Sequence, residues 1–299
     1  MDINKYAPTG KIGKNHLISL KNYGEEEIFE ILKLADRLSK AISVGEKPTS
    51  LKNKKVALIA KNGLIRHKIA FESAVSALSG TAVVCSMSGS EIETLVGDEL
   101  SAKAIAGYGV NALVVQTEKP GDASSLEKLV GLPVISANGK CGPCEALSAL
   151  LTYWRKKGSL GNAKIAMIGN PKEFADSFAY AFSICGFDIN FICPKELFDE
   201  ELQGYCRQFG DAEYFDDLKE GLKGVDAVFV SEDGLPKEFT LTEESYGVTN
   251  KSAVFHVLPI PKDASIDKSL LSSPNFYGLD EALALPEIEM ASLVLLMAK

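Results

Sequence analysis

Eight short, almost continuously apolar runs separated by stretches of helical periodicity are the feature that most constrains the fold of this chain. Runs of this kind, rich in Val and Ile, are typical of parallel strands that are covered on both faces. They lie at 55–60, 81–86, 111–116, 132–136, 164–169, 188–193, 226–231 and 253–258. Helical patterns fall at 24–41, 66–79, 97–108, 143–157, 174–185, 195–208 and 287–297. This alternation predicts an α/β fold built from doubly wound parallel sheets.

The eight runs form two groups of four, which predicts two α/β domains of similar size in the 299 residues. The helical pattern at 143–157 contains the predicted boundary, and it ends at Lys156-Lys157-Gly158. An irregular segment at 269–286 precedes the last apolar helix, which we expect to pack back onto the first domain. The predicted domains are therefore 1–144 with 286–299, and 145–285.

Composition excludes several classes of partner. A formal net charge of −8 argues against nucleic acid and anionic membrane surfaces as main partners. No apolar run approaches the roughly 18–20 residues that span a bilayer, and the first residues, MDINKYAPTGKIGK, lack the apolar region of a secretory signal. We therefore expect a cytoplasmic protein.

The six cysteines, at positions 85, 141, 144, 185, 193 and 206, mostly lie in apolar contexts and are predicted to be reduced core thiols. Cys141-Gly-Pro-Cys144 has the CxxC spacing of a redox pair or of half a zinc site. A zinc site needs a second pair of ligands, and the three histidines are not paired at metal-ligand spacing. We favour a coincidental spacing and predict no metal site.

The segment Lys61–Glu72, KNGLIRHKIAFE, joins an apolar run to a helical pattern and so predicts an anion site at a helix N-terminus. Arg66 falls in the first turn, where its guanidinium could clamp a phosphate or a carboxylate. Leu64 and Ile65 are apolar where a phosphate cradle would offer hydroxyl groups. Core packing at the helix start is the favoured interpretation of these two residues.

Five blocks in order along the chain together resemble the aspartate/ornithine carbamoyltransferase family, with the ornithine branch closer. They are KNHLISLKNYGEEEIFEILKLADRL followed by LKNKKVALIA, Arg66–Glu72, Gly142–Leu147, KIAMIGNPKEFADSFAYAFSICGFDINFICPK, and His256–Pro259. The resemblance implies a carbamoyl-phosphate domain followed by an amino-acid (acceptor) domain, and a homotrimer with active sites at subunit interfaces. It also implies that no cofactor or metal takes part. An amine attacks the carbonyl of carbamoyl phosphate, and the protein supplies positioning and electrostatic stabilisation.

The resemblance maps a carbamoyl-phosphate-type anion site onto five positions. Arg66 falls on the first arginine of the family's phosphate-binding block, and Lys68 stands where its second arginine would be. His67 replaces a hydroxyl residue, and Gln116 replaces the arginine that ends the third strand. Leu258 would offer its backbone carbonyl to the carbamoyl amide. Each lost donor to a charged oxygen is worth on the order of 1.5–3 kcal/mol, so we expect weakened anion binding.

The acceptor-type site implied by the resemblance comprises Glu145, Lys172, Ser231 and His256. Lys172 falls on one of the family's paired asparagines and Ser231 on its amine-binding aspartate. Glu145 replaces the glutamine that holds the carbamoyl amide; it could bind a cation or amine, although a solvated helix N-terminus is the favoured interpretation. For His256, a structural and a functional role both stay open.

Two further departures concern catalysis. Gly142 stands where the family has the histidine that polarises the carbamoyl carbonyl, and removing one such donor typically costs about 10²–10³ in rate. The stretch Ser88–Asp98 falls on the mobile loop that crosses to a neighbouring subunit in the family. Its carboxylates make it acidic here, which would repel a doubly charged phosphate.

These departures favour a degenerate family member, a pseudoenzyme that binds an amino acid or an anion or assembles with an active paralogue. The alternative is an active, divergent carbamoyltransferase that serves an amine other than the usual acceptor through Arg66, Lys68, Glu145 and His256. A nucleotide-binding dehydrogenase is disfavoured, because no G-x-G-x-x-G follows the run at 164–169.

Overall fold

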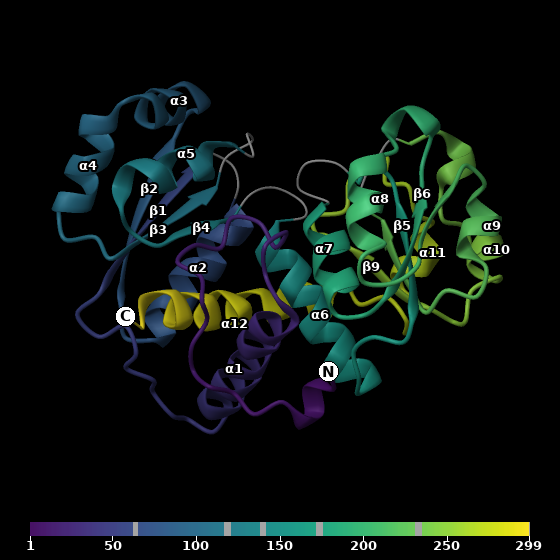
Figure 1. The fold of residues 1–299 in the computed structure, drawn as a ribbon, viewed down its shortest axis with the longest axis horizontal. Coiled ribbons are helices and arrows are strands. Elements are labelled where there is room, and N and C mark those ends of the chain that lie inside the picture. The colour runs from purple at the N-terminus through teal and green to yellow at the C-terminus, as the bar shows by residue number, and fades with distance from the viewer. Residues whose placement is uncertain (62–64, 117–120, 138–141, 172–175, 231–234, 299) are drawn as a thin grey trace. The chain divides into compact units, whose positions relative to one another are not determined.

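The computed structural model describes residues 1–61, 65–116, 121–137, 142–171, 176–230 and 235–298. The chain forms two compact units, coloured along the sequence in Figure 1. The N-terminal unit comprises Tyr6–Cys144 and Leu285–Lys299, and the C-terminal unit comprises Glu145–Ala284 and Met1–Lys5. The chain therefore passes from one unit to the other after Lys5, after Cys144 and after Ala284. Which ligand class each unit serves stays a prediction.

The N-terminal unit is built on a four-stranded parallel sheet in the order β2-β1-β3-β4 (Figure 1). Its strands are β1 (Lys55–Lys61), β2 (Thr81–Met87), β3 (Ala112–Gln116) and β4 (Val134–Ser136). The central β3 is buried along its whole length, whereas β2 alternates exposed and partly buried residues at the sheet edge. Continuous burial explains the apolar runs of β3 and β4, whereas β2 has an apolar run although it lies exposed at the edge.

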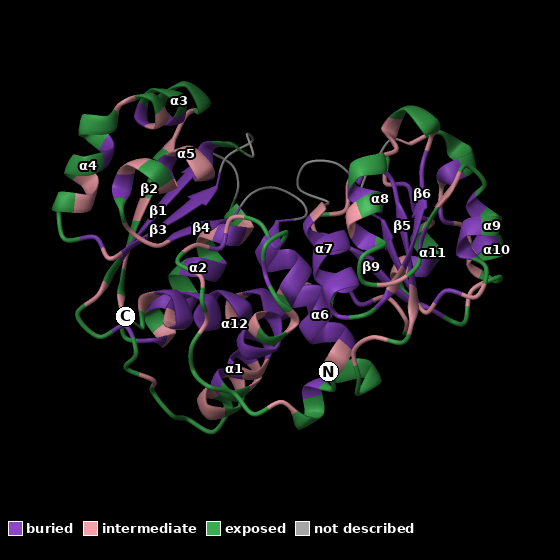
Figure 2. Cartoon of the chain, viewed as in Figure 1, coloured by how far each residue is buried: buried purple, intermediate pink, exposed green. Residues whose placement is uncertain are grey.

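Helices of the N-terminal unit connect and cover these strands. They are α1 (Glu25–Ser43), α2 (Ile65–Ala77), α3 (Gly89–Gly97), α4 (Glu99–Gly107) and α5 (Gly121–Val130). Figure 2 shows buried residues concentrated in the strands, with exposed residues on α3 and α4. Buried Glu30 on α1 accepts hydrogen bonds from the Thr9 N–H at 2.8 Å and the Gly10 N–H at 2.6 Å, which fixes the segment before the helix.

The C-terminal unit has a five-stranded parallel sheet in the order β7-β6-β5-β8-β9. Its strands are β5 (Lys164–Ile168), β6 (Asp188–Ile192), β7 (Ala212–Phe215), β8 (Ala227–Val230) and β9 (Ala253–His256). The helices that begin and end in this unit are α7 (Asp176–Ile184), α8 (Glu200–Cys206), α9 (Leu218–Leu222), α10 (Glu243–Tyr246) and α11 (Lys268–Leu271). The reversal of strand order between β5 and β8 is the switch point of a doubly wound sheet.

Two helices contribute residues to both units: α6 (Pro143–Lys157) and α12 (Gly278–Met297). The sequence predicted only the part of α12 after Pro286, because proline usually ends or begins a helix. In the structure Pro286 lies inside the helix. In the N-terminal unit, the α1 Ser39 hydroxyl donates to the Glu287 carboxylate of α12 at 2.7 Å.

The predicted α/β class with parallel sheets is confirmed, and each of the eight apolar runs contains a strand. Strand β7 was missed, as were the helices α3, α5, α9, α10 and α11. Residues 1–5 lie in the C-terminal unit and not with the first predicted domain. The reason is that Asn4 donates from Nδ2 to the Gly158 carbonyl at 2.8 Å and accepts from Trp154 Nε1 at 3.1 Å.

Cysteines 144, 185, 193 and 206 are buried thiols outside any disulfide of the described residues, as the sequence predicted. Burial raises the pKa of the Cys206 thiol to about 12, which keeps it protonated and unreactive. Cys85 corrects the prediction: it is exposed, because β2 lies at the sheet edge. Cys141 lies outside the described residues. Within the described part of the chain, no three His, Cys, Asp or Glu side chains gather as a metal site, and no helix is long and apolar enough to cross a membrane.

Candidate functional site

Three of the five predicted anion residues, Arg66, Lys68 and Gln116, lie near the carboxyl edge of the sheet in the N-terminal unit. Ala60 near the end of β1 pairs with Ser86 on β2 and with Gln116 on β3. All strands run parallel, so their carboxyl ends meet at one edge, where ligands of open α/β sheets bind. Helix α2 begins at Ile65, soon after β1 ends, and carries Arg66 in its first turn. The fold therefore brings the start of α2 and the ends of β2 and β3 to one edge.

Lys68 and His67 follow one another on α2, but their side chains reach different surroundings. The Lys68 ammonium donates to the Ser86 hydroxyl at 2.8 Å, at the end of β2. His67 is buried, and its Nδ1 lies 3.6 Å from the Glu289 Oε1 of α12, with side-chain exposures of 3% and 0%. Consecutive helical residues point about 100° apart, which accounts for the divergence. Arg66 and Lys68 are thus the partly exposed cations, and His67 points to α12 instead.

Gln116 is the last residue of β3 and only 1% exposed. Its side-chain Oε1 is buried, and none of the described residues donates a hydrogen bond to it. A buried acceptor without a partner costs free energy, and such a group calls for an explanation. An N–H group of a ligand bound at this edge would satisfy it. Gln116 therefore supplies an acceptor where the resemblance implies a cation.

Ile65 contradicts the core-packing interpretation of the helix start. Its side chain is 66% exposed, and that of Ile69, one turn later, is 56% exposed. The core face of α2 is instead formed by residues such as Phe71 and Val75. Ile65 lies on the outer face because α2 turns its apolar residues after position 69 toward the sheet. Leu64 lies outside the described residues.

The acceptor-type residues that the structure describes, Glu145 and His256, belong to the C-terminal unit. His256 ends β9 opposite Val230 of β8, and its Nδ1 lies 3.0 Å from the Val257 carbonyl. A carbonyl only accepts, so Nδ1 carries the proton. His256 is buried, and Leu258, predicted in the anion site, is partly exposed in this unit beside a cis peptide to Pro259.

Glu145 lies in the first turn of α6 and is fully buried. The interpretation of a solvated carboxylate is therefore wrong; the side chain is enclosed although a helix N-terminus is often open to water. A carboxylate in the first turn is still stabilised by the helix dipole. The other two predicted acceptor residues, Lys172 and Ser231, lie outside the described residues.

The acidic stretch Ser88–Asp98 is a capped helix, not the loop that the resemblance implied. The Ser88 side chain accepts from the Glu91 N–H, and the Glu91 carboxylate accepts from the Ser88 N–H at 2.7 Å, forming a capping box. This backbone hydrogen bond lowers the pKa of Glu91. Asp98 in turn caps α4 by accepting from the Leu100 N–H at 3.0 Å, and hydrogen bonds from Ser101 lower its pKa. Both carboxylates therefore serve as helix caps.

The sequence analysis missed two residues that contact the candidate site. Ser86 binds Lys68, and the only sequence signal is a hydroxyl residue near the end of an apolar run. Glu289 faces His67, and its signal is a carboxylate inside an otherwise apolar helical pattern. Neither signal predicts which residue is contacted, because the two residues of each pair lie on different elements that only the fold brings together.

Comparison with known proteins agrees with this architecture. Residues 15–155 match the family model of the aspartate/ornithine carbamoyltransferase carbamoyl-P binding domain. The ornithine carbamoyltransferase of Bacillus subtilis is 30% identical over 231 residues, covering 74% of this chain and 70% of the relative. The aspartate carbamoyltransferase catalytic subunit of Methanothrix thermoacetophila is 26% identical, covering 91% and 97%.

Among solved structures, the ornithine carbamoyltransferase from Pyrococcus furiosus superimposes with a TM-score of 0.87 at 23% sequence identity, covering 95% of this chain and 97% of that one. At that identity the likeness concerns the fold. Together with the sequence matches over both units, it means that this chain belongs to the aspartate/ornithine carbamoyltransferase family.

Proposed function

We propose that this family member has lost ordinary carbamoyl transfer and acts in the cytoplasm as a binding or assembly paralogue. The observation that carries the proposal is Gly142. It lies buried just before α6, where the resemblance implies a histidine that polarises the carbamoyl carbonyl. Glycine offers no side-chain donor to a developing oxyanion, and loss of one such donor typically costs about 10²–10³ in rate.

The start of α2 supports the same proposal. Ile65 presents an exposed aliphatic side chain where the resemblance implies a hydroxyl group. Lys68 gives one of its N–H groups to Ser86, and Gln116 is neutral where a guanidinium is implied. Arg66 remains to attract an anion. A site with one guanidinium and one partly occupied ammonium suits weak anion binding better than stabilisation of a charged transition state.

The test is an assay of carbamoyl transfer at millimolar carbamoyl phosphate, with ornithine and with aspartate as acceptors. The Bacillus subtilis relative serves as the active comparator. We expect kcat/KM at least about 100-fold below the comparator, from the missing oxyanion donor alone. A shift of the melting temperature by phosphate would show that the preparation is folded and binds an anion. Turnover within tenfold of the comparator would contradict the proposal.

An active, divergent carbamoyltransferase is the second candidate, and the buried Gln116 acceptor favours it. A carbamoyl group carries N–H donors of the kind that Oε1 lacks. This candidate predicts phosphate release from carbamoyl phosphate with an amine other than ornithine or aspartate. The test that separates the two candidates measures phosphate release from carbamoyl phosphate in the presence of each of a panel of amino acids. A release rate above the rate without any amine, for any amino acid of the panel, would favour the second candidate.

We further propose that the chain assembles through the outer face of α2 and β2, as a homotrimer or with a paralogue. The exposed apolar side chains here are Ile65 and Ile69 on α2 and Val83 and Cys85 on β2, and the two elements pack against each other. Exposed apolar side chains grouped on one face typically mark an interface.

The Ile69→Glu variant is expected to reduce the assembly to monomers, because a carboxylate buried in an apolar interface is strongly unfavourable. Light scattering coupled to gel filtration gives the mass. Leu100→Glu on α4 is the matched control, since Leu100 is also exposed but lies on another face. A monomeric mass for the wild-type chain would contradict the proposed homotrimer. An unchanged mass for Ile69→Glu would show that the interface does not include this face.

A further inference from the structure

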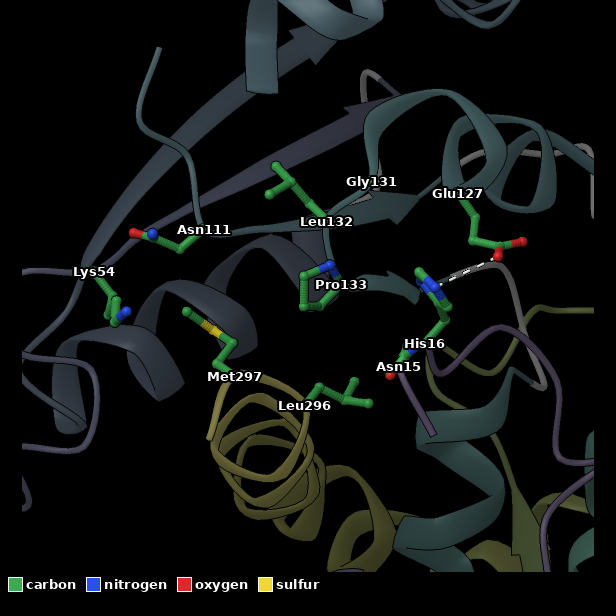
Figure 3. Close-up of a pocket in the computed structure, with 10 residues that line it drawn as sticks. All are labelled: Asn15, His16, Lys54, Asn111, Glu127, Gly131, Leu132, Pro133, Leu296 and Met297. Atoms are coloured by element: carbon green, nitrogen blue, oxygen red, sulfur yellow. Dashed lines mark ion pairs between the residues drawn. The ribbon is translucent and has the colours of Figure 1, made fainter. Parts of the chain in front are cut away.

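A cavity of about 480 Å³ lies within the N-terminal unit and is used by neither the anion site nor the proposed interface (Figure 3). Its volume falls in the range of pockets that hold small molecules, about 300–1,000 Å³. Lys54, which precedes β1, Asn111, which precedes β3, and Pro133, which precedes β4, all line it. The cavity therefore opens at the amino ends of the strands, whereas Arg66 and Lys68 lie at the carboxyl ends. It is a separate place on the same sheet.

One end of the cavity carries a carboxylate held in a fixed position. His16 Nε2 lies 3.4 Å from Glu127 Oε1, as the dashed line in Figure 3 marks. The Val134 N–H donates to His16 Nδ1 at 3.2 Å, so the proton of the neutral ring is on Nε2 and faces Glu127. Among the described residues only His16 pairs with Glu127, and the Glu127 side chain is partly exposed, so its second oxygen can accept from a ligand. This end suits an ammonium group.

The opposite end carries donors. Lys54 brings an ammonium group into the lining. Asn111 Oδ1 accepts from the Lys55 N–H at 2.9 Å, so the amide NH₂ of Asn111 is the part that can donate to a ligand. Figure 3 shows Lys54 and Asn111 on one side of the cavity and Glu127 with His16 on the other. A cation beside an amide donor suits a carboxylate.

The surface between the two ends is apolar. Leu132 and Pro133 come from the segment before β4, and Leu296 and Met297 come from the last turn of α12. These side chains offer no hydrogen bonds, so the middle of a ligand that spans the cavity must be hydrocarbon. A simple anion would meet Glu127, and a simple amine would meet Lys54. A molecule with both charges, kept apart, matches Glu127, Lys54 and the apolar surface between them.

We propose that this cavity binds a small zwitterion whose ammonium and carboxylate groups stand at opposite ends of an apolar chain. The ammonium group pairs with Glu127, the carboxylate pairs with Lys54 and Asn111, and the chain lies along Leu132 and Leu296. An α-amino acid with an uncharged side chain, such as norleucine, carries both charges on one carbon and so does not present them at opposite ends of an apolar chain. The site is independent of any carbamoyl transfer, so it stands or falls separately from the proposed function.

Calorimetric titration of the full chain with ω-amino acids tests the site. The probes are 4-aminobutanoate, 6-aminohexanoate and 8-aminooctanoate, which differ only in the separation of their charges. The matched controls are norleucine, an isomer of 6-aminohexanoate with both charges on one carbon, and hexanoate and hexylammonium, which carry one charge each. We expect at least one ω-amino acid to bind at least about 10-fold more tightly than all three controls, because each control loses one charge-assisted hydrogen bond.

Glu127→Gln and Lys54→Gln are each expected to weaken that probe by about 10- to 100-fold. Glu93→Gln on α3 and Lys52→Gln, which remove the same charges outside the lining, are expected to leave the affinity unchanged. The proposal is overturned if no ω-amino acid exceeds norleucine and the two singly charged probes, or if the control variants lose as much affinity as the cavity variants. The comparison of isomers on the wild-type chain decides the matter even if a variant fails to fold.

Discussion

The Glu289→Ala variant is expected to lose about 2–5 kcal/mol of unfolding free energy, because it empties a fully buried position and leaves the buried imidazole of His67 without its neighbouring carboxylate. Glu289 is fully buried on α12, and its carboxylate lies 3.6 Å from His67 Nδ1 on α2. Without the carboxylate, the buried imidazole loses a neighbour that offsets its desolvation. Urea unfolding followed by circular dichroism measures the loss.

A double-mutant cycle separates the pair from general cavity effects. If the two side chains interact, His67→Ala combined with Glu289→Ala costs less than the sum of the single variants. The control is Glu99→Ala on α4, whose exposed ion pair with Lys103 is worth at most about 0.5 kcal/mol. Additive single variants, or a Glu289→Ala cost no larger than that of the control, would show that the pair does not fasten α12 to α2.

Phe182→Ala is expected to destabilise the C-terminal unit by about 3–5 kcal/mol, the range for a fully buried aromatic residue. Its ring centroid lies 5.0 Å from that of Phe187 and 4.8 Å from that of Phe229, both in edge-to-face geometry. Edge-to-face pairs add to the stabilisation from burial itself. Tyr153 of α6 makes a third such contact, with 6.4 Å between centroids, so the variant removes both the filled volume and three ring contacts between α7 and its neighbours.

The matched control for Phe182 is Phe209→Ala, which removes the same side chain from a position that is 42% exposed. Phe209 contacts the ring of Tyr205, with 5.3 Å between centroids. We expect a cost of about 1 kcal/mol or less, because little apolar surface returns to water. Equal shifts of the urea midpoint in the two variants would mean that the aromatic cluster is not the centre of this core.

Most strands could be predicted because they are buried on both faces, which leaves a continuous apolar run in the sequence. The edge strand β2 is not buried, but its sequence, TAVVCSM, is still an apolar run. Strand β7 was missed: Ala212 is buried, Glu213 is exposed and the rest is only partly buried. Four residues of that kind, at an edge of the sheet, give no run to detect. The first half of α12 was missed because Pro286 suggested a boundary, whereas the helix continues through it.

The candidate site was predictable only where it depends on local sequence. The position of Arg66 at a helix start follows from the strand-to-helix pattern. The exposure of Ile65 and the burial of Glu145 do not, since both depend on which surfaces the folded chain covers. The contact of His67 with Glu289 joins segments that only the tertiary fold brings together. The cavity lined by Lys54 and Glu127 likewise has no continuous sequence signature.

The discontinuity of the N-terminal unit has a consequence for synthesis on the ribosome. Its sheet is complete once β4 has been made, but residues 285–297 of α12 follow only after the whole of residues 145–284. During that interval the groups on α1 and α2 that contact Glu287 and Glu289 have no partner from α12. The C-terminal unit, whose main segment is continuous, can close first. The N-terminal unit is therefore synthesised first but completes its packing last.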